Sequence, residues 1–133
     1  MLKEIPIKTA KRTELVNITG KVEQIVKESK VAGGLCVVYT PHTTAAITIN
    51  ENADPDVIAD IIAKLNKLIP ENENYLHSEG NGDAHIKSSL LGCEKTLLIK
   101  QGKLLLGTWQ GIYFCEFDGP RERKVLIKIQ NSD

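Results

Sequence analysis

Gln110-Gly-Ile-Tyr-Phe-Cys-Glu-Phe-Asp118 is the longest of four apolar runs in the last third of the chain. The other runs are Thr96–Ile99, Leu104–Leu106 and Arg123–Gln130, and a Gln101-Gly-Lys103 turn separates two of them. Short apolar runs joined by polar turns are typical of neighbouring antiparallel strands. We therefore expect this part of the chain to form most of a β-sheet.

Helices are expected in the first two thirds of the chain. Val22, Ile25 and Val26 recur at helical spacing. Asp54-Pro-Asp56 provides an N-cap, a proline in the first turn and an acidic residue ahead of a long apolar stripe, and a shorter helix is expected over Asp83–Leu91. Strand-like runs precede and separate these helices: Lys3–Ile7, Leu35–Tyr39 and Ala45–Ile49. The sequence thus predicts an α+β fold with antiparallel pairing.

Length and charge limit the class of protein. The chain has 133 residues, of which 41% are hydrophobic and 26% charged, so we expect a single domain over residues 1–133. Its 17 basic residues balance its 17 acidic ones, so no net field favours nucleic acid or an anionic membrane. No stretch approaches the roughly 20 apolar residues that a membrane span needs. A cytoplasmic protein is expected.

The cysteines and the single tryptophan are predicted to be structural. Cys36, Cys93 and Cys115 are odd in number and widely spaced, and we place each in an apolar segment. This pattern favours buried, reduced thiols over a zinc cluster or a nucleophile. Trp109 is expected to pack in the core, with a pocket lining or an oligomer contact as the alternatives.

All three histidines lie in polar segments. His42 stands in Thr40-Pro-His-Thr-Thr44, and His77 and His85 are joined by a Gly-rich loop that could fold back on itself. Three imidazoles meeting at one point would suit zinc or a similar divalent ion with an open coordination position. Because no HExxH or CxxC motif accompanies them, a phosphate or substrate site that uses them as donors and proton carriers is the alternative.

The Gly80-Asn-Gly-Asp-Ala84 segment leads into the short predicted helix. It matches neither a P-loop nor a dinucleotide-binding fingerprint. Free backbone N–H groups at a helix N-terminus nonetheless favour an anion such as phosphate. A tight turn capped by Asp83 explains the same residues without a ligand.

Carboxylates and arginines gather at the end of the Gln110–Asp118 run. Glu116 and Asp118 share one face of the predicted strand, and Arg121 and Arg123 follow the next turn. Adjacent carboxylates suit Mg²⁺ or general-base chemistry, whereas paired arginines suit phosphate. A surface salt-bridge cluster is the simpler alternative, although the apolar neighbours of Glu116 favour partial burial.

Several motifs together resemble the YjbQ family, also called UPF0047 or the secondary thiamine-phosphate synthase family. They run in order along almost the whole chain: His42-Thr-Thr-Ala45, Asn50-Glu-Asn-Ala-Asp54, Gly80-Asn81, Ala84-His-Ile-Lys87, Ser89-Leu-Leu-Gly92 and Gly107-Thr-Trp-Gln110. The last of these motifs is the most specific. On these residues the chain is identified as a member of the family.

The resemblance implies a small sandwich of mixed, largely antiparallel sheets with flanking helices, assembled as a homotrimer with sites near the subunit boundaries. It also implies a transferase of the thiamine-phosphate synthase type. In that reaction the nitrogen of a thiazole phosphate displaces pyrophosphate from hydroxymethylpyrimidine diphosphate. The alternative function is a trimeric protein that binds a metal or a phosphorylated metabolite.

Site residues are assigned as a hypothesis on this basis. His42, His85 and Glu116 are expected to act in catalysis. A divalent metal, zinc or magnesium, would be bound by His42, His77 and His85. A small phosphorylated substrate would contact a larger polar set: Thr43, Asn50, Asn81, Ser89, Gln110, Arg121 and Arg123.

Overall fold

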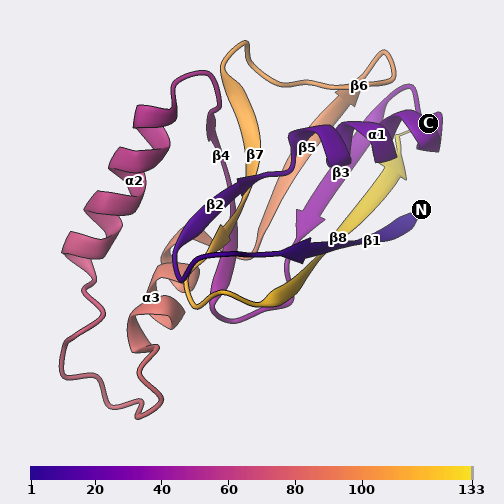
Figure 1. Cartoon of the computed structure of the whole chain (residues 1–133). Helices are drawn as coiled ribbons and strands as arrows, with labels where there is room; N and C mark the ends of the chain where they lie inside the picture. Colours follow the sequence, from indigo (N-terminus) through magenta and orange to yellow (C-terminus); the bar gives the residue numbers. More distant parts are fainter. Residues whose placement is uncertain (133) are drawn as a thin grey trace.

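The computed structural model describes residues 1–132, which form three helices and eight strands (Figure 1). In chain order the elements are β1 (Leu2–Lys8), β2 (Glu14–Asn17), α1 (Thr19–Ser29), β3 (Gly34–Tyr39), β4 (Ala45–Glu51), α2 (Pro55–Leu68), α3 (Gly82–Leu91), β5 (Glu94–Lys100), β6 (Lys103–Leu104), β7 (Gln110–Glu116) and β8 (Glu122–Asn131). The predicted strands and helices are confirmed, with ends that shift by one or two residues. Only β2 was missed.

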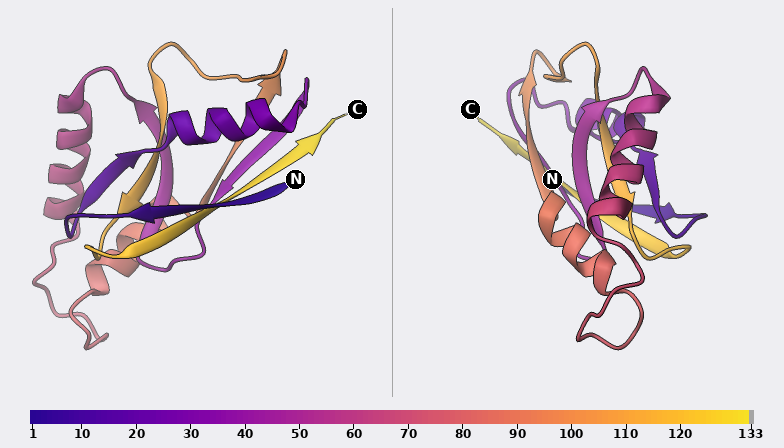
Figure 2. Two further views of the ribbon diagram at one scale, coloured as in Figure 1. Left: turned by 45° about the vertical axis from the view of Figure 1, so that its right-hand side comes forward. Right: turned by 90° about the vertical axis from the view of Figure 1, so that its left-hand side faces the viewer.

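The strands form two antiparallel sheets, which confirms the predicted α+β fold with antiparallel pairing. The larger sheet has the order β1-β8-β3-β5-β6, and the smaller has the order β2-β7-β4. Helix α1 packs on the inner face of the larger sheet, against β6 and β8, and also contacts β7 of the smaller sheet. Helices α2 and α3 pack on the opposite, outer face of the smaller sheet (Figure 2). The result is a sandwich with helices on the outside of one sheet.

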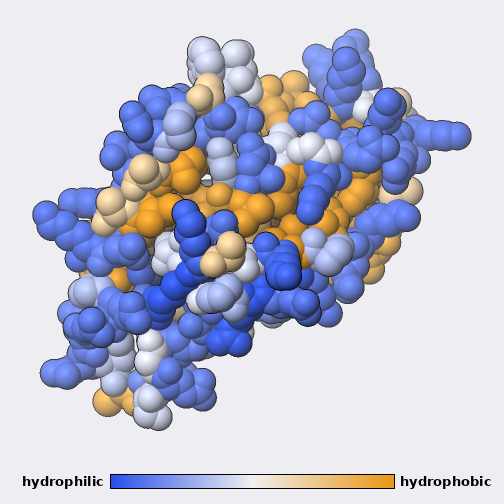
Figure 3. Space-filling view, in the orientation of Figure 1, coloured by the Kyte–Doolittle hydropathy of each residue, from blue (hydrophilic) through white to orange (hydrophobic). Residues whose placement is uncertain are grey.

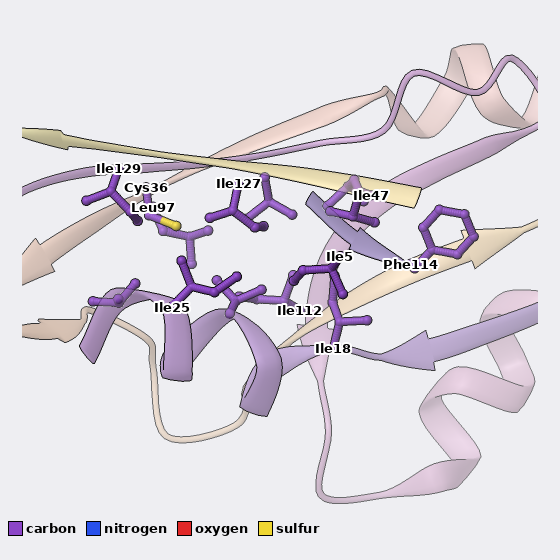
Figure 4. Packing of buried hydrophobic residues seen from close by; sticks show 14 of the residues in the cluster. Ile5, Ile18, Ile25, Cys36, Ile47, Leu97, Ile112, Phe114, Ile127 and Ile129 are labelled. Atoms are coloured by element: carbon purple, nitrogen blue, oxygen red, sulfur yellow. The ribbon is translucent and has the colours of Figure 1, made fainter. Parts of the chain in front are cut away.

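The main core lies between the two sheets. On β8 the buried residues Val125, Ile127 and Ile129 alternate with the exposed Lys124 and Lys128, which is the two-residue period of a strand with one buried face. Residues from both sheets and from α1 meet this row in Figure 4, among them Ile5, Ile25, Cys36, Leu97, Ile112 and Phe114. Burial of this apolar surface is the main force that holds the sheets together.

Strand β7 is buried on both faces. Ile112 and Phe114 point into the core between the sheets, while Tyr113 and Cys115 point into a second cluster under α2 and α3. This explains why the run from 110 to 116 is almost continuously apolar instead of alternating.

Helix α2 begins as its sequence predicts. The Asp54 carboxylate accepts a hydrogen bond from the backbone N–H of Asp56 at 2.9 Å, and Pro55 occupies the first turn. The helix ends at Leu68, just before Pro70. Leu65 is the buried residue of α2 and packs in a cluster with residues of the smaller sheet.

Two predictions about packing are wrong. Trp109, which we expected in the core, is 61% exposed because it lies in the loop that leads into β7. Cys93, which we expected to be buried, is exposed because it lies in the short turn between α3 and β5. Cys36 and Cys115 are buried as predicted.

Charged and polar residues cover most of the face seen in Figure 3. A band of hydrophobic surface crosses its middle, between β1 on one side and β2 with α1 on the other. None of the helices in residues 1–132 is long and apolar enough to cross a membrane.

Candidate functional site

A cleft of about 470 Å³ opens between the loop that joins β3 to β4 and one side of α3. Four of the predicted site residues meet here: His42, Thr43, His85 and Ser89. Ser88, Gly92 and Cys93 complete the lining, to which no carboxylate side chain of residues 1–132 belongs. The loop and the helix are held together by Ser88, whose hydroxyl donates to the carbonyl of Ala45 at 2.6 Å.

The imidazole of His42 is fixed by a backbone group of β8. Its Nε2 atom accepts a hydrogen bond from the N–H of Lys124 at 3.0 Å. Burial lowers the pKa of His42, and the positive charges of Arg123, Lys124 and Arg121 lower it further against the opposing effect of Glu116. Both effects favour the neutral form of the imidazole.

His77 and His85 touch each other, as the Gly-rich loop between them allows. Their ring centroids lie 5.1 Å apart in an edge-to-face arrangement with an interplanar angle of 84°. His85 also lines the cleft, whereas His77 lies outside it, 3.6 Å from Glu79. The three histidines thus form a row in which His85 is shared, with His77 on one side and the cleft with His42 on the other.

The three histidines predicted to bind a metal do not meet at one point. Over residues 1–132, no three His, Cys, Asp or Glu side chains converge closely enough to hold a metal ion. The structure does not bring His42, His77 and His85 together as one ligand set, and a bound metal stays a prediction.

Glu116 and Arg123 form a buried ion pair beneath the loop. The Arg123 Nε donates to the Glu116 carboxylate at 2.9 Å, and only 5% of the Arg123 side chain and 0% of the Glu116 side chain is exposed. Thr9 also donates to Glu116, at 2.7 Å, and the Arg123 guanidinium donates to the hydroxyl of Thr44 at 2.8 Å. The pair therefore anchors Thr44, two residues from His42.

These contacts decide the charge state of Glu116. Burial alone would raise its pKa, but hydrogen bonds from Arg123, Thr9 and the N–H of Asp118 outweigh burial and lower it. We predicted catalysis for Glu116 and phosphate binding for Arg123. Either role would require a buried side chain to reach the ligand. Arg121, by contrast, is 53% exposed and pairs with Asp118 at 2.9 Å.

The N-terminus of α3 is connected to this cluster through Asn81. Its Nδ2 donates to the Asp118 carboxylate at 2.8 Å, while its Oδ1 is buried and has no hydrogen-bond partner in the described part of the chain. Gly82 follows at a place where a Cβ would lie 2.7 Å from the ring of Tyr75, so the preceding loop packs directly on the helix start.

Asp83 does not cap α3, contrary to the simpler reading of the Gly80–Ala84 segment. Its carboxylate is fully buried and accepts from Lys87 at 2.9 Å and from Arg12 at 3.1 Å. Burial raises its pKa, but the hydrogen bonds from Arg12 and Lys87 lower it overall. Lys87, 1% exposed, also donates to Asn66 on α2, so this cluster joins both helices to the N-terminal segment.

The profile of the UPF0047 protein YjbQ-like family matches residues 3–132. The chain belongs to this family. It is 62% identical over 129 residues to the UPF0047 protein of Methanocaldococcus jannaschii, an alignment that covers 97% of this chain and 94% of that protein. It is 52% identical over 130 residues to the UPF0047 protein YugU of Bacillus subtilis, which covers 97% and 98% of the two chains.

Solved structures of YjbQ-like proteins have the same fold. An uncharacterized conserved protein from Clostridium acetobutylicum superposes with a TM-score of 0.95 at 55% identity, covering 96% of this chain and 99% of that one. A YbjQ-like protein of unknown function from Sulfolobus solfataricus superposes with a TM-score of 0.96 at 36% identity, covering 99% and 97%. The sandwich implied by the sequence motifs is confirmed as the YjbQ-like fold.

The YjbQ-like motifs occupy two separate places in this chain. Asn50 lies near the far end of β4, about 16 Å from Ala45 at the cleft by the usual rise of a strand. Gln110 pairs with the neighbouring Glu51, and its side chain accepts from the N–H of Gly107 at 2.8 Å. The predicted substrate residues Asn50 and Gln110 are therefore not brought to the cleft within one chain.

Sequence reasoning missed several residues of the YjbQ-like site. Ser88 and Cys93 line the cleft, and Thr9 and Thr44 hold the buried ion pair. Each depends on contacts between segments far apart in the chain. Lys87 could have been found, because its spacing of four residues from Asp83 on a helix is that of an ion pair.

Proposed function

We propose that this YjbQ-like protein is a transferase of the thiamine-phosphate synthase type that acts on small phosphorylated substrates at the cleft beside His42 and His85. The observation that carries the proposal is the composition of the cleft. Imidazole and hydroxyl groups line it, and no carboxylate from the described part of the chain is present there to repel phosphate. An anionic ligand is the class that such a surface favours.

The reaction asks for charge stabilisation more than for a strong base. A carbon–nitrogen bond forms to the thiazole nitrogen, the carbon–oxygen bond to the diphosphate breaks, and pyrophosphate leaves with the bonding electrons. Donors aimed at the departing oxygens lower the barrier for such a step. His42, Thr43 and His85 are the residues we assign to this role. Arg121, which is exposed and does not line the cleft, is a further candidate cation.

A homotrimer with sites between subunits is part of the proposal. Apolar side chains on the outer face of the larger sheet support an assembly, since Leu35 lies opposite Leu98 and both are exposed, at 37% and 54%. Trp109, 61% exposed beside Gln110, is a second candidate contact. A neighbouring subunit would then supply Gln110 and Asn50 to the cleft of its partner.

Turnover is the direct test. The protein is incubated with hydroxymethylpyrimidine diphosphate and thiazole phosphate, and thiamine phosphate and pyrophosphate are measured by chromatography. We expect equal amounts of both products from the native protein, none from His85→Ala, and native amounts from the control Gln24→Ala on the exposed side of α1. Undiminished turnover by His85→Ala, with its fold and assembly intact, contradicts the assignment.

Composite sites have their own test. His85→Ala and Gln110→Ala are each expected to be inactive, but subunits of the two variants mixed under dissociating conditions and reassembled should regain part of the activity. Sites formed within one subunit would gain nothing from mixing.

A second candidate function is a protein that binds a metal or a phosphorylated metabolite without catalysis. The observation in its favour is that Glu116, which we expected to act in catalysis, is fully buried, already bonded to Arg123 and absent from the lining of the cleft. This candidate predicts tight binding of phosphorylated ligands with no product. Elemental analysis of the native protein beside His77→Ala and His85→Ala tests its metal-binding form, because a zinc centre should be lost in both variants.

A further inference from the structure

We propose that His42 is held as the neutral tautomer with its proton on Nδ1, and that this N–H donates to an oxygen of an anionic ligand in the cleft. The proton position is a statement about the free protein. The role toward the ligand rests on the proposed function. In this assignment His42 is a hydrogen-bond donor to substrate and is neither a metal ligand nor a general base.

The partner of the ring fixes the tautomer. A neutral imidazole has one N–H and one lone pair, and a hydroxyl partner could serve either of them. The partner here is the backbone N–H of Lys124, 3.0 Å from Nε2, and a backbone N–H can only donate. The lone pair must therefore be on Nε2, and the proton on Nδ1.

The surroundings keep the ring in this position. The hydroxyl of Thr40 donates to the carbonyl of Lys124 at 3.3 Å, so the loop is bonded to the same residue of β8 that holds His42. On the other side of the loop, Thr44 is bonded to the buried guanidinium of Arg123. Turning the imidazole away would break its hydrogen bond to the N–H of Lys124 and leave that N–H to solvent.

The Nδ1–H of His42 is one of the few hydrogen-bond donors at the cleft that are not already bonded to the protein. Ser88 and Ser89 line it, but their hydroxyl protons are already donated to the carbonyls of Ala45 and His85, at 2.6 and 2.9 Å. No partner of His42 Nδ1 occurs among residues 1–132, and the ring lines both this cleft and a neighbouring pocket that includes Lys8, Lys21 and Lys124. In the proposal, an acceptor oxygen of the ligand takes the place of water at this donor.

The same geometry separates His42 from any metal chemistry at His77 and His85. A metal needs an imidazole lone pair, and the only one on His42 is taken by Lys124. Nδ1 could bind a cation only after losing its proton or after the ring leaves its backbone partner.

Nitrogen NMR of the native protein tests the proton position. Long-range proton–nitrogen correlation spectra at neutral pH should show a protonated Nδ1 and a bare Nε2 for His42. Addition of inorganic pyrophosphate should shift the Nδ1 resonance, and addition of zinc alone should leave His42 unchanged while His77 or His85 responds. A proton on Nε2, or a zinc-dependent change at His42, overturns the assignment.

Two conservative variants test the donor role. Asparagine at 42 places an amide nitrogen where Nδ1 was, whereas glutamine reaches the place of Nε2 and can still accept from Lys124. We expect His42→Asn to bind pyrophosphate within a few-fold of the native protein, and His42→Gln to bind about tenfold more weakly although it is the more stable variant. The reverse order of affinities overturns the donor role.

Failure of the proposed reaction would be recognised separately. A His42 signal that responds to pyrophosphate in a protein that makes no thiamine phosphate contradicts the transferase and leaves the His42 assignment standing. The expected tautomer with no response to pyrophosphate contradicts the donor role itself.

Discussion

The guanidinium of Arg123 and the carboxylate of Glu116 neutralise each other inside the fold, directly beneath the loop that carries His42. The pair is shielded from water, and Thr9, Thr44 and the N–H of Asp118 take up further hydrogen-bonding positions around it. Such a pair stabilises a fold only while both partners are present, because either charge left alone is strongly disfavoured.

Removing one partner of this pair should cost more than removing both. Glu116→Leu leaves the Arg123 charge buried and unpaired, and we expect it to lower the free energy of unfolding by about 3–5 kcal/mol. The double variant Glu116→Leu with Arg123→Met removes the unpaired charge and should recover part of that loss. Urea unfolding followed by circular dichroism measures both, and equal losses in the single and double variants would contradict the prediction.

Stability should fall in acid because of Glu116 and Asp83. The pKa of each is lower in the folded protein than its usual value, so folding favours the charged forms. Their contribution is complete above the unfolded-state pKa of about 4 and is lost as pH falls through the folded-state values. Urea midpoints measured from pH 7 down to pH 3 should drop over this range, and the drop should be shallower in Glu116→Gln. An unchanged midpoint at pH 3 would contradict both assignments.

Cys93 should be the only cysteine that reacts quickly in the native protein. Burial raises the pKa of Cys36 to about 11 and that of Cys115 to about 12, so neither forms a thiolate at neutral pH, whereas Cys93 is exposed at the edge of the cleft. One equivalent of a disulfide-exchange reagent should be consumed rapidly, and none by Cys93→Ser. Rapid reaction of two or three thiols without denaturant would show that the core opens readily.

A charge on the outer face of the larger sheet should weaken the proposed assembly. Leu98→Lys places an ammonium group opposite Leu35, where a subunit contact would have to bury it. We expect sedimentation equilibrium to show a smaller mass for this variant than for the native protein. Lys100→Gln, on the same strand, is the matched control and should keep the native mass. A native mass for Leu98→Lys would place the contact elsewhere.

The sequence predicted the elements well and their contacts poorly, for physical reasons that particular residues illustrate. Asp54 and Pro55 predict the start of α2 because the cap is a local interaction between neighbouring residues. Strand β2 was missed because its four residues are too few to show a period, and it is stabilised by pairing with β7. Cys93 and Trp109 were wrongly predicted to be buried. Both lie in turns, and the exposure of a side chain in a turn depends on the three-dimensional course of the chain and not on the neighbouring residues in the sequence.

The candidate site shows the same limit. The loop histidines were identified from their polar surroundings, and two of them do line the cleft. The position of the proton on His42 could not be predicted, because the hydrogen bond that decides it comes from Lys124, 82 positions away in the sequence. Asn50 and Gln110 matched family motifs, yet a motif gives order along the chain and not distance in space.

The position of β7 has a consequence for the motions of the molecule. This strand is covered on both faces and bonded to a neighbour along both edges, β2 on one side and β4 on the other. No partial opening of the smaller sheet can expose its amides without separating one of those neighbours or a layer of the core. Amide hydrogens in the middle of β7 should therefore exchange with solvent only through global unfolding, while those of the exposed residues 76–80 around His77 should exchange much faster.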